Sequence, residues 1–259
     1  MRPGLENKWI LITGASSGIG AAAARELGAQ GARLLLGARR VARLQEVAVE
    51  ARQAGAVSAQ YHALDVTSVQ SVGEFVSWVT SVTAQVDVLV NNAGGAHGLD
   101  FVADARDADW EAMIETNVLG LLRVTRAVLP LLPHHQGSMI INVGSTAGHA
   151  AYEGGAAYCA AKAGELQITR ALRLELCGTG IRVGTLDPGL TETEFSMVRF
   201  KGDADRARRV YEGMEPLTAG DIAEALVWMA SRPPHVNVGE LVITPVAQAA
   251  VYKIHRRST

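Results

Sequence analysis

The chain has 259 residues, of which 48% are hydrophobic and 19% are charged, and this composition is typical of a soluble globular protein with a large core. Because the formal net charge is only −2, we do not expect binding to nucleic acid, and we interpret the short cationic stretch 253–257 as a solvated end or an interface. No apolar run approaches about 18 residues, and the N-terminus lacks the pattern of a signal peptide, so we expect a cytoplasmic protein without a membrane partner.

The first predicted elements are a strand, a glycine-rich turn and a helix. Residues 8–13 form a short apolar strand, and residues 21–30 form a helix. Glycines in such a turn let the backbone approach a dinucleotide pyrophosphate, and the helix N-terminus offers free N–H groups to the anion. The chain has Ala21 where a P-loop has its lysine. The candidate cofactor-binding residues in this turn are Gly14, Ser16, Ser17, Gly18, Ile19 and Gly20.

The second predicted strand, residues 33–38, ends in Arg39 and Arg40. A site specific for NAD usually places Asp or Glu near this position for the ribose 2′-hydroxyl. Two guanidinium groups instead suit a 2′-phosphate, with which they form paired charge-assisted hydrogen bonds. The alternative is that both arginines are simply exposed at the end of a strand. We interpret them as a binding site for NADP(H).

The third predicted strand, residues 58–63, follows an amphipathic helix over residues 41–54. Asp65 and Val66 come next, at the position where a contact with the adenine ring would fall. Asp65 could equally be a turn residue or the start of a helix cap. The following helix, which begins at Val69, has an apolar stripe that we assign to the core.

The fourth predicted strand, residues 86–90, runs into small polar residues and a glycine. Such residues let a cofactor ribose come close, while Asn91 and its neighbour can also tie strands together. The candidate cofactor-binding residues here are Asn92, Ala93 and Gly94. The helix predicted over residues 107–132 carries Asn117 among apolar neighbours, and a buried Asn needs hydrogen-bond partners. It either holds a water that relays protons to Lys162 or satisfies an irregularity of the helix.

The central stretch of the sequence contains Ser145, Tyr158 and Lys162 after the apolar strand 139–143. Tyr158 and Lys162 are four residues apart, so they lie on one face of the predicted helix. A free phenol has a pKa of about 10, and a nearby ammonium lowers that pKa because it favours phenolate. With Ser145 bound to the substrate oxygen, these groups suit carbonyl reduction or alcohol oxidation. Taken alone, Tyr158 and Lys162 would be an ordinary exposed helix pair.

The last third of the chain continues the alternation of strands and helices. A sixth strand, residues 181–186, ends where Pro188 is expected to stop the ladder, and the candidate cofactor-binding residues there are Pro188, Gly189 and Thr191. A polar, arginine-rich segment around 190–215 is predicted to be a substrate lid that contains a helix. The final elements are a helix over 219–231 and a strand over 240–244. Alternating strands and helices predict a single α/β domain, residues 1–259, with a doubly wound parallel sheet.

Cysteine and histidine spacing does not indicate a metal site. Cys159 and Cys177 are predicted to lie in one helix, too far apart to bond each other, so we expect buried thiols in a reduced compartment. The seven histidines lack the spacing of a zinc site, and we expect chemistry without a metal.

Taken together and in their order along the chain, the motifs of this sequence resemble those of the short-chain dehydrogenase/reductase superfamily. The motifs are Gly14-x3-Gly18-x-Gly20, Asn91-Asn92-Ala93-Gly94, Asn117, Ser145, Tyr158-x3-Lys162 and Pro188-Gly189. The resemblance implies a Rossmann-type sheet of about seven parallel strands with helices on both faces. It also implies that Asn117, Ser145, Tyr158 and Lys162 are the catalytic group.

Three segments in the second half, residues 193–203, 232–238 and 244–248, are similar to the NADP-dependent 3-hydroxy acid dehydrogenases. This resemblance implies a homotetramer that acts on serine, allo-threonine and related short 3-hydroxy acids and reduces some aldehydes and ketones. Residues 95–98 and 149–153 depart from the family pattern beside the active site, so the resemblance does not specify the substrate.

A carboxylate substrate would need a cation, because an unpaired buried carboxylate is unstable. The candidates are Arg199 and Lys201 on the lid, which could equally be surface charges, and His149 near Ser145. Other functions remain open: a broad carbonyl reductase, a biosynthetic ketoreductase, or an NADP-binding sensor that has lost catalysis. The sensor is disfavoured because all four catalytic positions carry competent residues.

Overall fold

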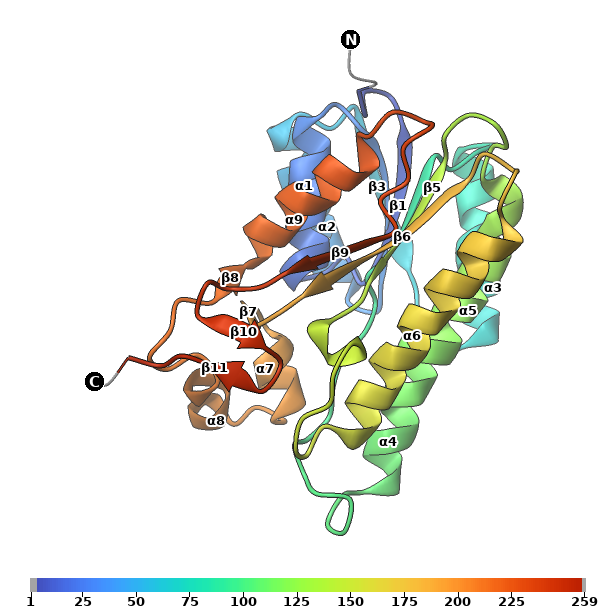
Figure 1. Ribbon diagram of the computed structural model, residues 1–259. Helices are drawn as coiled ribbons and strands as arrows, with labels where there is room; N and C mark the ends of the chain where they lie inside the picture. Colours follow the sequence, from blue (N-terminus) through green and yellow to red (C-terminus); the bar gives the residue numbers. More distant parts are fainter. Residues whose placement is uncertain (1–3, 258–259) are drawn as a thin grey trace.

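The computed structural model describes residues 4–257, which are built around one parallel seven-stranded sheet (Figure 1). The strand order is β3-β2-β1-β4-β5-β6-β9, and every neighbouring pair is parallel. The strands are β1 (Trp9–Thr13), β2 (Arg33–Ala38), β3 (Ser58–Ala63), β4 (Val88–Asn91), β5 (Met139–Val143), β6 (Arg182–Pro188) and β9 (Glu240–Ile243). This arrangement confirms the predicted Rossmann-type sheet of about seven strands.

Helices cover both faces of the sheet (Figure 1). One face carries α1 (Gly18–Ala29), α2 (Val41–Ala54) and α9 (Ala219–Ala230), and the other carries α3 (Val69–Val82), α4 (Asp107–Ile114), α5 (Leu121–Val128) and α6 (Ala156–Glu175). The inner strands, such as β1, β4 and β5, are buried on both sides because helices cover both faces of the sheet. On β1, Ile10 and Ile12 join the core under α1 and α9, whereas Leu11 joins the core on the opposite face.

The direction of winding reverses between β1 and β4. The chain runs outward from β1 to β3, returns to β4 beside β1, and then runs outward in the opposite direction to β9. Ligands of open α/β sheets bind at such a reversal, beyond the carboxyl ends of the strands. The fold therefore places the expected ligand position next to the ends of β1 and β4.

Three local predictions about this framework are wrong. The helix predicted over 107–132 is interrupted by a π-helical segment, Glu115–Gly120, and closes with a 3₁₀ turn, Leu129–Leu131. Strand β6 runs through Pro188, because the missing N–H of proline costs no hydrogen bond there. Strand β5, the neighbour on that side, has already ended beside Leu186. Helix α6 ends at Glu175, so Cys177 lies beyond it and is exposed, whereas Cys159 is buried.

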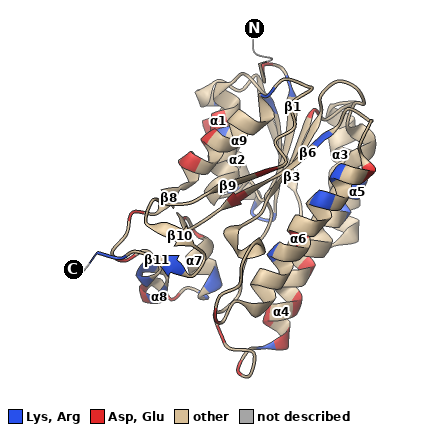
Figure 2. Cartoon of the chain, viewed as in Figure 1, with Lys and Arg blue, Asp and Glu red and all other residues tan. Residues whose placement is uncertain are grey.

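The segment predicted to be a lid begins and ends at one small pair of strands. Strand β7 (Thr191–Glu192) pairs with β8 (Leu217–Thr218), and α7 (Phe195–Arg199) and α8 (Ala204–Arg209) lie between them. A C-terminal hairpin, β10 (Gln248–Ala250) and β11 (Lys253–Ile254), lies beside this segment (Figure 1), and Lys and Arg gather there (Figure 2). Within residues 4–257, no helix is both long and apolar enough to cross a membrane.

A buried network of polar side chains joins β4, β5, α5 and α6. The Asn91 amide donates to Thr125 Oγ1 and to Asn142 Oδ1, both over 2.9 Å. The Asn142 amide in turn donates to Thr169 Oγ1 of α6 over 2.8 Å. Side-chain amides can link a strand to a helix, which backbone hydrogen bonds of the sheet cannot do. This network therefore fixes α6 against the sheet.

We expect Asn142→Ala to lower the free energy of unfolding by about 3 kcal/mol, because it removes the hydrogen bond that Asn142 accepts from Asn91 and the one that it donates to Thr169, and opens a small cavity. Urea unfolding measures the change. Gln70→Ala, on the exposed face of α3, is the control and should change the free energy by no more than about 0.5 kcal/mol. A loss below about 1 kcal/mol in the Asn142 variant would show that the chain of amides is not important for stability.

Candidate active site

The glycine turn after β1 brings two backbone segments unusually close together. Gly14 and Gly18 have φ values of +64° and +53°, in the left-handed region that favours glycine. A Cβ atom on Gly14 would lie 2.9 Å from the Cα atom of Ala93, which follows β4. The turn therefore needs glycine both for its conformation and for the approach of the neighbouring strand end.

Helix α1 begins at Gly18, three residues before the predicted start. Gly18, Ile19 and Gly20 thus form its first turn, where backbone N–H groups have no acceptor within the helix. Ser17 is the N-cap, but its side chain does not cap the helix. These free N–H groups and the positive end of the helix dipole fit the pyrophosphate of a dinucleotide.

The two arginines after β2 have different surroundings. Arg40 donates from Nε to Ser16 Oγ over 3.3 Å and from Nη2 to Ser17 Oγ over 2.5 Å. It also pairs with Glu194 Oε2 at 2.9 Å, which joins the glycine turn to the segment after β7. Arg39 is exposed, and its positive charge acts on the carboxylate of Asp65. Only Arg40 is therefore held against the glycine turn.

Asp65 is a turn residue in this structure. Its Oδ1 accepts hydrogen bonds from the Thr67 backbone N–H and hydroxyl over 3.0 and 2.7 Å. Burial raises the pKa of Asp65, but the bonds from Thr67 and the charge of Arg39 outweigh it and hold that pKa below its usual value. The alternative that Asp65 is a turn residue is thus confirmed for its side chain. The contact of Asp65 and Val66 with adenine stays a prediction.

The segment after β4 lies against two candidate catalytic residues. The Asn92 amide ties it to the end of β1, since it donates to Thr13 O over 2.9 Å and to Gly14 O over 3.2 Å. A Cβ atom on Gly94 would lie 2.6 Å from Asn117 Oδ1 and 3.6 Å from Lys162 Nζ. Glycine at position 94 is what allows these two side chains to reach the strand end.

Asn117 occupies the π-helical segment and is almost fully buried. Its amide donates to Met113 O over 2.7 Å and to Gly95 O over 2.9 Å, and its Oδ1 accepts from the Gly95 N–H over 3.1 Å. The side chain therefore joins the last turn of α4 to Gly95. It also holds the segment after β4 in place.

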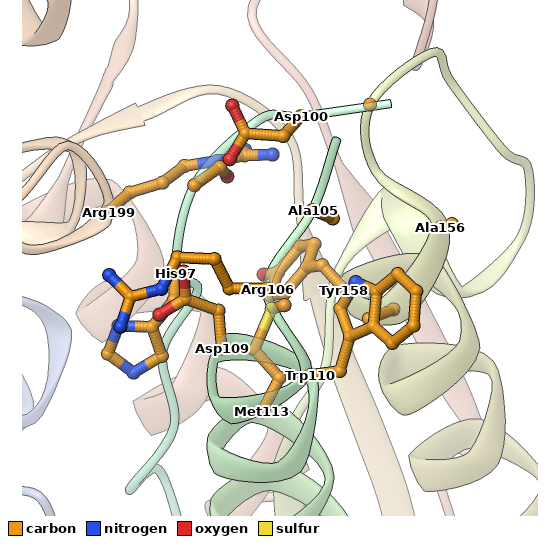
Figure 3. A pocket seen from close by; sticks show the side chains of 13 residues that line it. His97, Asp100, Ala105, Arg106, Asp109, Trp110, Met113, Ala156, Tyr158 and Arg199 are labelled. Atoms are coloured by element: carbon orange, nitrogen blue, oxygen red, sulfur yellow. The ribbon is translucent and has the colours of Figure 1, made fainter. Parts of the chain in front are cut away.

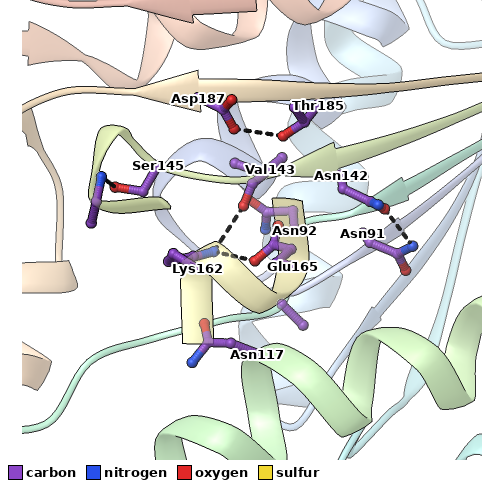
Figure 4. A network of polar contacts seen from close by, with 12 residues as sticks. Asn91, Asn92, Asn117, Asn142, Val143, Ser145, Lys162, Glu165, Thr185 and Asp187 are labelled. Carbon is purple, nitrogen blue, oxygen red and sulfur yellow. Dashed lines mark hydrogen bonds and ion pairs between the residues drawn. The ribbon is translucent and has the colours of Figure 1, made fainter. Parts of the chain in front are cut away.

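Beyond the end of β5, the turn that carries Ser145 packs against the first turns of α6, which carry Tyr158 and Lys162. Ser145 begins a 3₁₀ turn (Thr146–Gly148), and its Oγ accepts from the Ala147 N–H over 3.1 Å, so its own O–H remains free to donate. Lys162 is buried one turn after Tyr158 on α6, and its Nζ donates to Val143 O over 2.9 Å (Figure 4).

Glu165 is a charged residue at this site that the sequence analysis missed. Its Oε2 accepts from Lys162 Nζ over 2.7 Å, and both side chains are buried (Figure 4). Burial disfavours the ammonium, but the charges of Glu165 and Tyr158 outweigh this and hold the pKa of Lys162 above its usual value. The sequence shows that Lys162 and Glu165 are three residues apart on a helix, which indicates an ion pair. It does not show that this pair is buried.

One pocket opens beside the Tyr158 ring, and Arg199 of α7 reaches into it (Figure 3). Arg199 donates from Nε to Gly98 O over 2.9 Å and from Nη2 to the Tyr152 hydroxyl over 3.0 Å. The Arg199 guanidinium and the Phe195 ring each lie 5.7 Å from the centroid of the Tyr158 ring. Helix α7 thus forms one wall of the pocket.

The other two predicted substrate residues lie elsewhere. Lys201 is half exposed and pairs with Asp109 Oδ2 at 2.8 Å, as expected of a surface charge. His149 Nε2 lies 2.7 Å from Asp187 Oδ2, and His149 does not line the pocket. Instead, residues that the sequence analysis did not assign line the pocket, and these include His97, Asp100, Trp110 and Met113.

Burial raises the pKa of Tyr152 to about 12, against the charge of Arg199. Tyr152 is therefore a neutral phenol at physiological pH and accepts the hydrogen bond from Arg199. Residues 4–257 contain no group of three His, Cys, Asp or Glu side chains arranged to hold a metal ion.

Residues 8–204 match the short chain dehydrogenase family. The chain is 42% identical over 254 residues to the NADP-dependent 3-hydroxy acid dehydrogenase of Schizosaccharomyces pombe, with 98% of each chain covered. It is 38% identical over 252 residues to the serine 3-dehydrogenase of Agrobacterium fabrum, which covers 96% of this chain and 98% of that one. A solved structure of serine dehydrogenase in a closed form with NADP+ is similar at a TM-score of 0.88 and 39% identity, covering 96% of this chain and 100% of the other.

Proposed function

This chain belongs to the short-chain dehydrogenase family, and from that premise we propose that it is an NADP-dependent oxidoreductase acting on a small 3-hydroxy acid. The reaction would move a hydride between the nicotinamide and the hydroxyl-bearing carbon of the substrate. One observation carries the proposal: the Tyr158 phenol and the guanidinium over its ring line a single pocket, and a buried ammonium lies one turn after the phenol on the same helix.

The residues at the switch of strand order fit a dinucleotide. The close approach of Gly14 to Ala93 and the uncapped start of α1 suit a pyrophosphate, and Arg40 with Ser16 and Ser17 suits a 2′-phosphate. When bound, the nicotinamide supplies or accepts the hydride. We propose that the residues which hold the dinucleotide are those assigned from the sequence, namely Gly14, Ser16, Ser17, Gly18, Ile19, Gly20, Arg39, Arg40, Asp65, Val66, Asn92, Ala93, Gly94, Tyr158, Lys162, Pro188, Gly189 and Thr191.

Tyr158 is the group that exchanges a proton with the substrate oxygen. In alcohol oxidation its phenolate takes the hydroxyl proton, and in carbonyl reduction its phenol gives that proton back. The Lys162 ammonium favours the phenolate, because it places positive charge one helical turn away. Ser145 donates its free O–H to the substrate oxygen, where negative charge develops. Asn117 keeps the segment after β4 in position beside Lys162.

Arg199 is the residue that we propose to bind a substrate carboxylate. In a 3-hydroxy acid the reacting carbon is two bonds from the carboxyl carbon, so the cation and the phenol must line one small pocket. Arg199 meets this condition, since its guanidinium lies over the Tyr158 ring. Its contacts with Gly98 O and Tyr152 aim it into the pocket, which lowers the entropy lost when it binds an anion.

The protein is further proposed to be a homotetramer in the cytoplasm. Support comes from large apolar side chains that are exposed in the monomer at two places, on the π-helical segment with α5 and near the C-terminal hairpin. These side chains are Leu119, Leu122, Val242, Val246 and Tyr252.

Tyr158→Phe should lower kcat by about 1000-fold, because it removes the hydroxyl that exchanges the proton. NADPH should still bind to the variant, which quenching or enhancement of its fluorescence would show. Tyr61→Phe, on the edge strand β3, is the control and should keep full activity. Activity within tenfold of wild type in the Tyr158 variant would remove this residue from the chemistry.

Arg40→Ala with Arg39→Ala should weaken NADPH binding by about 10- to 100-fold, as expected for lost charge-assisted bonds to a phosphate, and should change NADH binding little. Titration of the protein with each cofactor measures both effects. Arg25→Ala, which removes an exposed arginine on the outer side of α1, should change neither. Equal losses for the two cofactors would refute the 2′-phosphate role.

Arg199→Met should raise KM for a 3-hydroxy acid such as serine by about 10- to 100-fold, because a bound carboxylate would lose its charged partner. Turnover of an uncharged secondary alcohol or ketone should change much less. Arg208→Met, on the same segment but paired with Asp205 outside the pocket, is the matched control. Parallel losses on acids and ketones would contradict carboxylate recognition by Arg199 and favour the broad carbonyl reductase.

A further inference from the structure

A buried carboxylate lies beside Lys162, and no step of the proposed reaction uses it. The Glu165 side chain is 3% exposed, and its Oε2 accepts from Lys162 Nζ over 2.7 Å. Its other oxygen, Oε1, is buried without a hydrogen-bond partner among residues 4–257. A carboxylate that is buried and only half satisfied is costly to keep, which indicates a role beyond packing.

The charged groups that face Glu165 are few. Lys162 and Tyr158 lie on the same helix, and Asp187 approaches from β6 with His149 paired behind it. The nearby side chains of the π-helical segment and of β5, and the polar residue one turn later on α6, are uncharged: Asn117, Asn142 and Thr169. Farther out, Arg170 of α6 forms an exposed pair with Glu240 of β9. The Lys162 ammonium is thus the one cation in direct contact with Glu165 among the described residues.

We propose, on the premise of the function given above, that Glu165 is a positioning residue which aims Lys162 and offsets part of its charge, and so sets the pH at which Tyr158 releases its proton.

The geometry supports both parts of this role. An ammonium has three N–H donors, and Val143 O and Glu165 Oε2 hold two of them, so the third is left for the side of Tyr158 and the cofactor. A bare ammonium lowers the pKa of a nearby phenol, and a carboxylate in contact with that ammonium opposes the effect. Glu165 therefore cancels part of the positive charge that Lys162 presents to Tyr158.

Glu165 also changes its own charge near physiological pH. Burial raises the pKa of Glu165 to about 7, against the charge and hydrogen bond of Lys162, while the charge of Asp187 adds to the rise. A raised pKa in the folded state stabilises the protein below the ordinary value of 4.5, and that contribution is lost as pH rises toward 7. Protonation of Glu165 below this range leaves the charge of Lys162 less offset.

The test measures the ionisation of Tyr158 directly, from the difference in ultraviolet absorbance between each protein and the same protein carrying Tyr158→Phe. Glu165→Gln keeps the size of the side chain and removes its charge, so the ionisation of Tyr158 should move to lower pH by about one unit. The rise of kcat/KM with pH in alcohol oxidation should move with it. Glu165→Asp keeps the charge and should restore the wild-type position, and Glu175→Gln, at an exposed glutamate on the same helix, should change nothing.

An unshifted or upward-shifted Tyr158 ionisation in Glu165→Gln would overturn the proposal, even if that variant were less stable. Should the variant fail to fold, the wild-type protein provides a second measurement. It has four lysines, of which Lys162 is the buried one, and the nitrogen NMR signal of its ammonium should show an inflection near pH 7. A flat signal would contradict the role. Neither measurement needs a substrate, so a failure of all hydroxy acids and carbonyls to react with NADP(H) would overturn the proposed function separately.

Discussion

The burial of the Lys162 ammonium is the constraint on which the active-site region depends. A cation removed from water is stable only if its surroundings compensate it, and Lys162 is almost completely buried. The compensation comes from the end of β5, through Val143 O, and from the same helix, through Glu165. Gly94 has no side chain because Lys162 and Asn117 already occupy that space. These requirements fix α6 in one position against the sheet.

The parallel sheet then delivers the remaining groups to the same place. Because all seven strands point the same way, the segments after β1, β4, β5 and β6 emerge at one edge. The glycine turn, the Asn92 amide, Ser145 and the turn after Pro188 all lie at such strand ends. Side-chain amides behind this edge, Asn91 and Asn142, keep its strands and helices in register. Precision in the site thus comes from the core and not from the loops.

Helix α7 links the two halves of the site. Glu194, just before α7, pairs with Arg40 at the glycine turn, while Phe195 and Arg199 pack on the Tyr158 ring. Strands β7 and β8 pair with each other at the two ends of the segment that contains α7 and α8, so both ends of this segment are held at one place. The Arg40 pair is half exposed, so it contributes little to holding this segment against the glycine turn.

Much of this protein was determined by local sequence. Runs of five or six residues separated by segments of helical periodicity defined the strands, the helices and the parallel sheet, and most of these runs are apolar because the inner strands must be buried on both faces. The glycine turn, the pair Tyr158 and Lys162, and Ser145 were assigned correctly to a turn, one helix face and a strand end, since spacing alone decides these placements. Their roles as a group rested on the order of motifs along the chain.

Only the tertiary structure decided which charges meet. Glu165 and Glu175 look alike on α6, yet one is buried against Lys162 and the other is exposed, because the register of the helix on the sheet selects between them. Arg199 enters the pocket while Lys201, two residues later, turns outward to Asp109. The π-helical segment likewise follows from the Asn117 amide, which binds Met113 O and Gly95 O from separate elements. Contacts between distant segments depend on how elements pack, and no periodicity within a single segment records that packing.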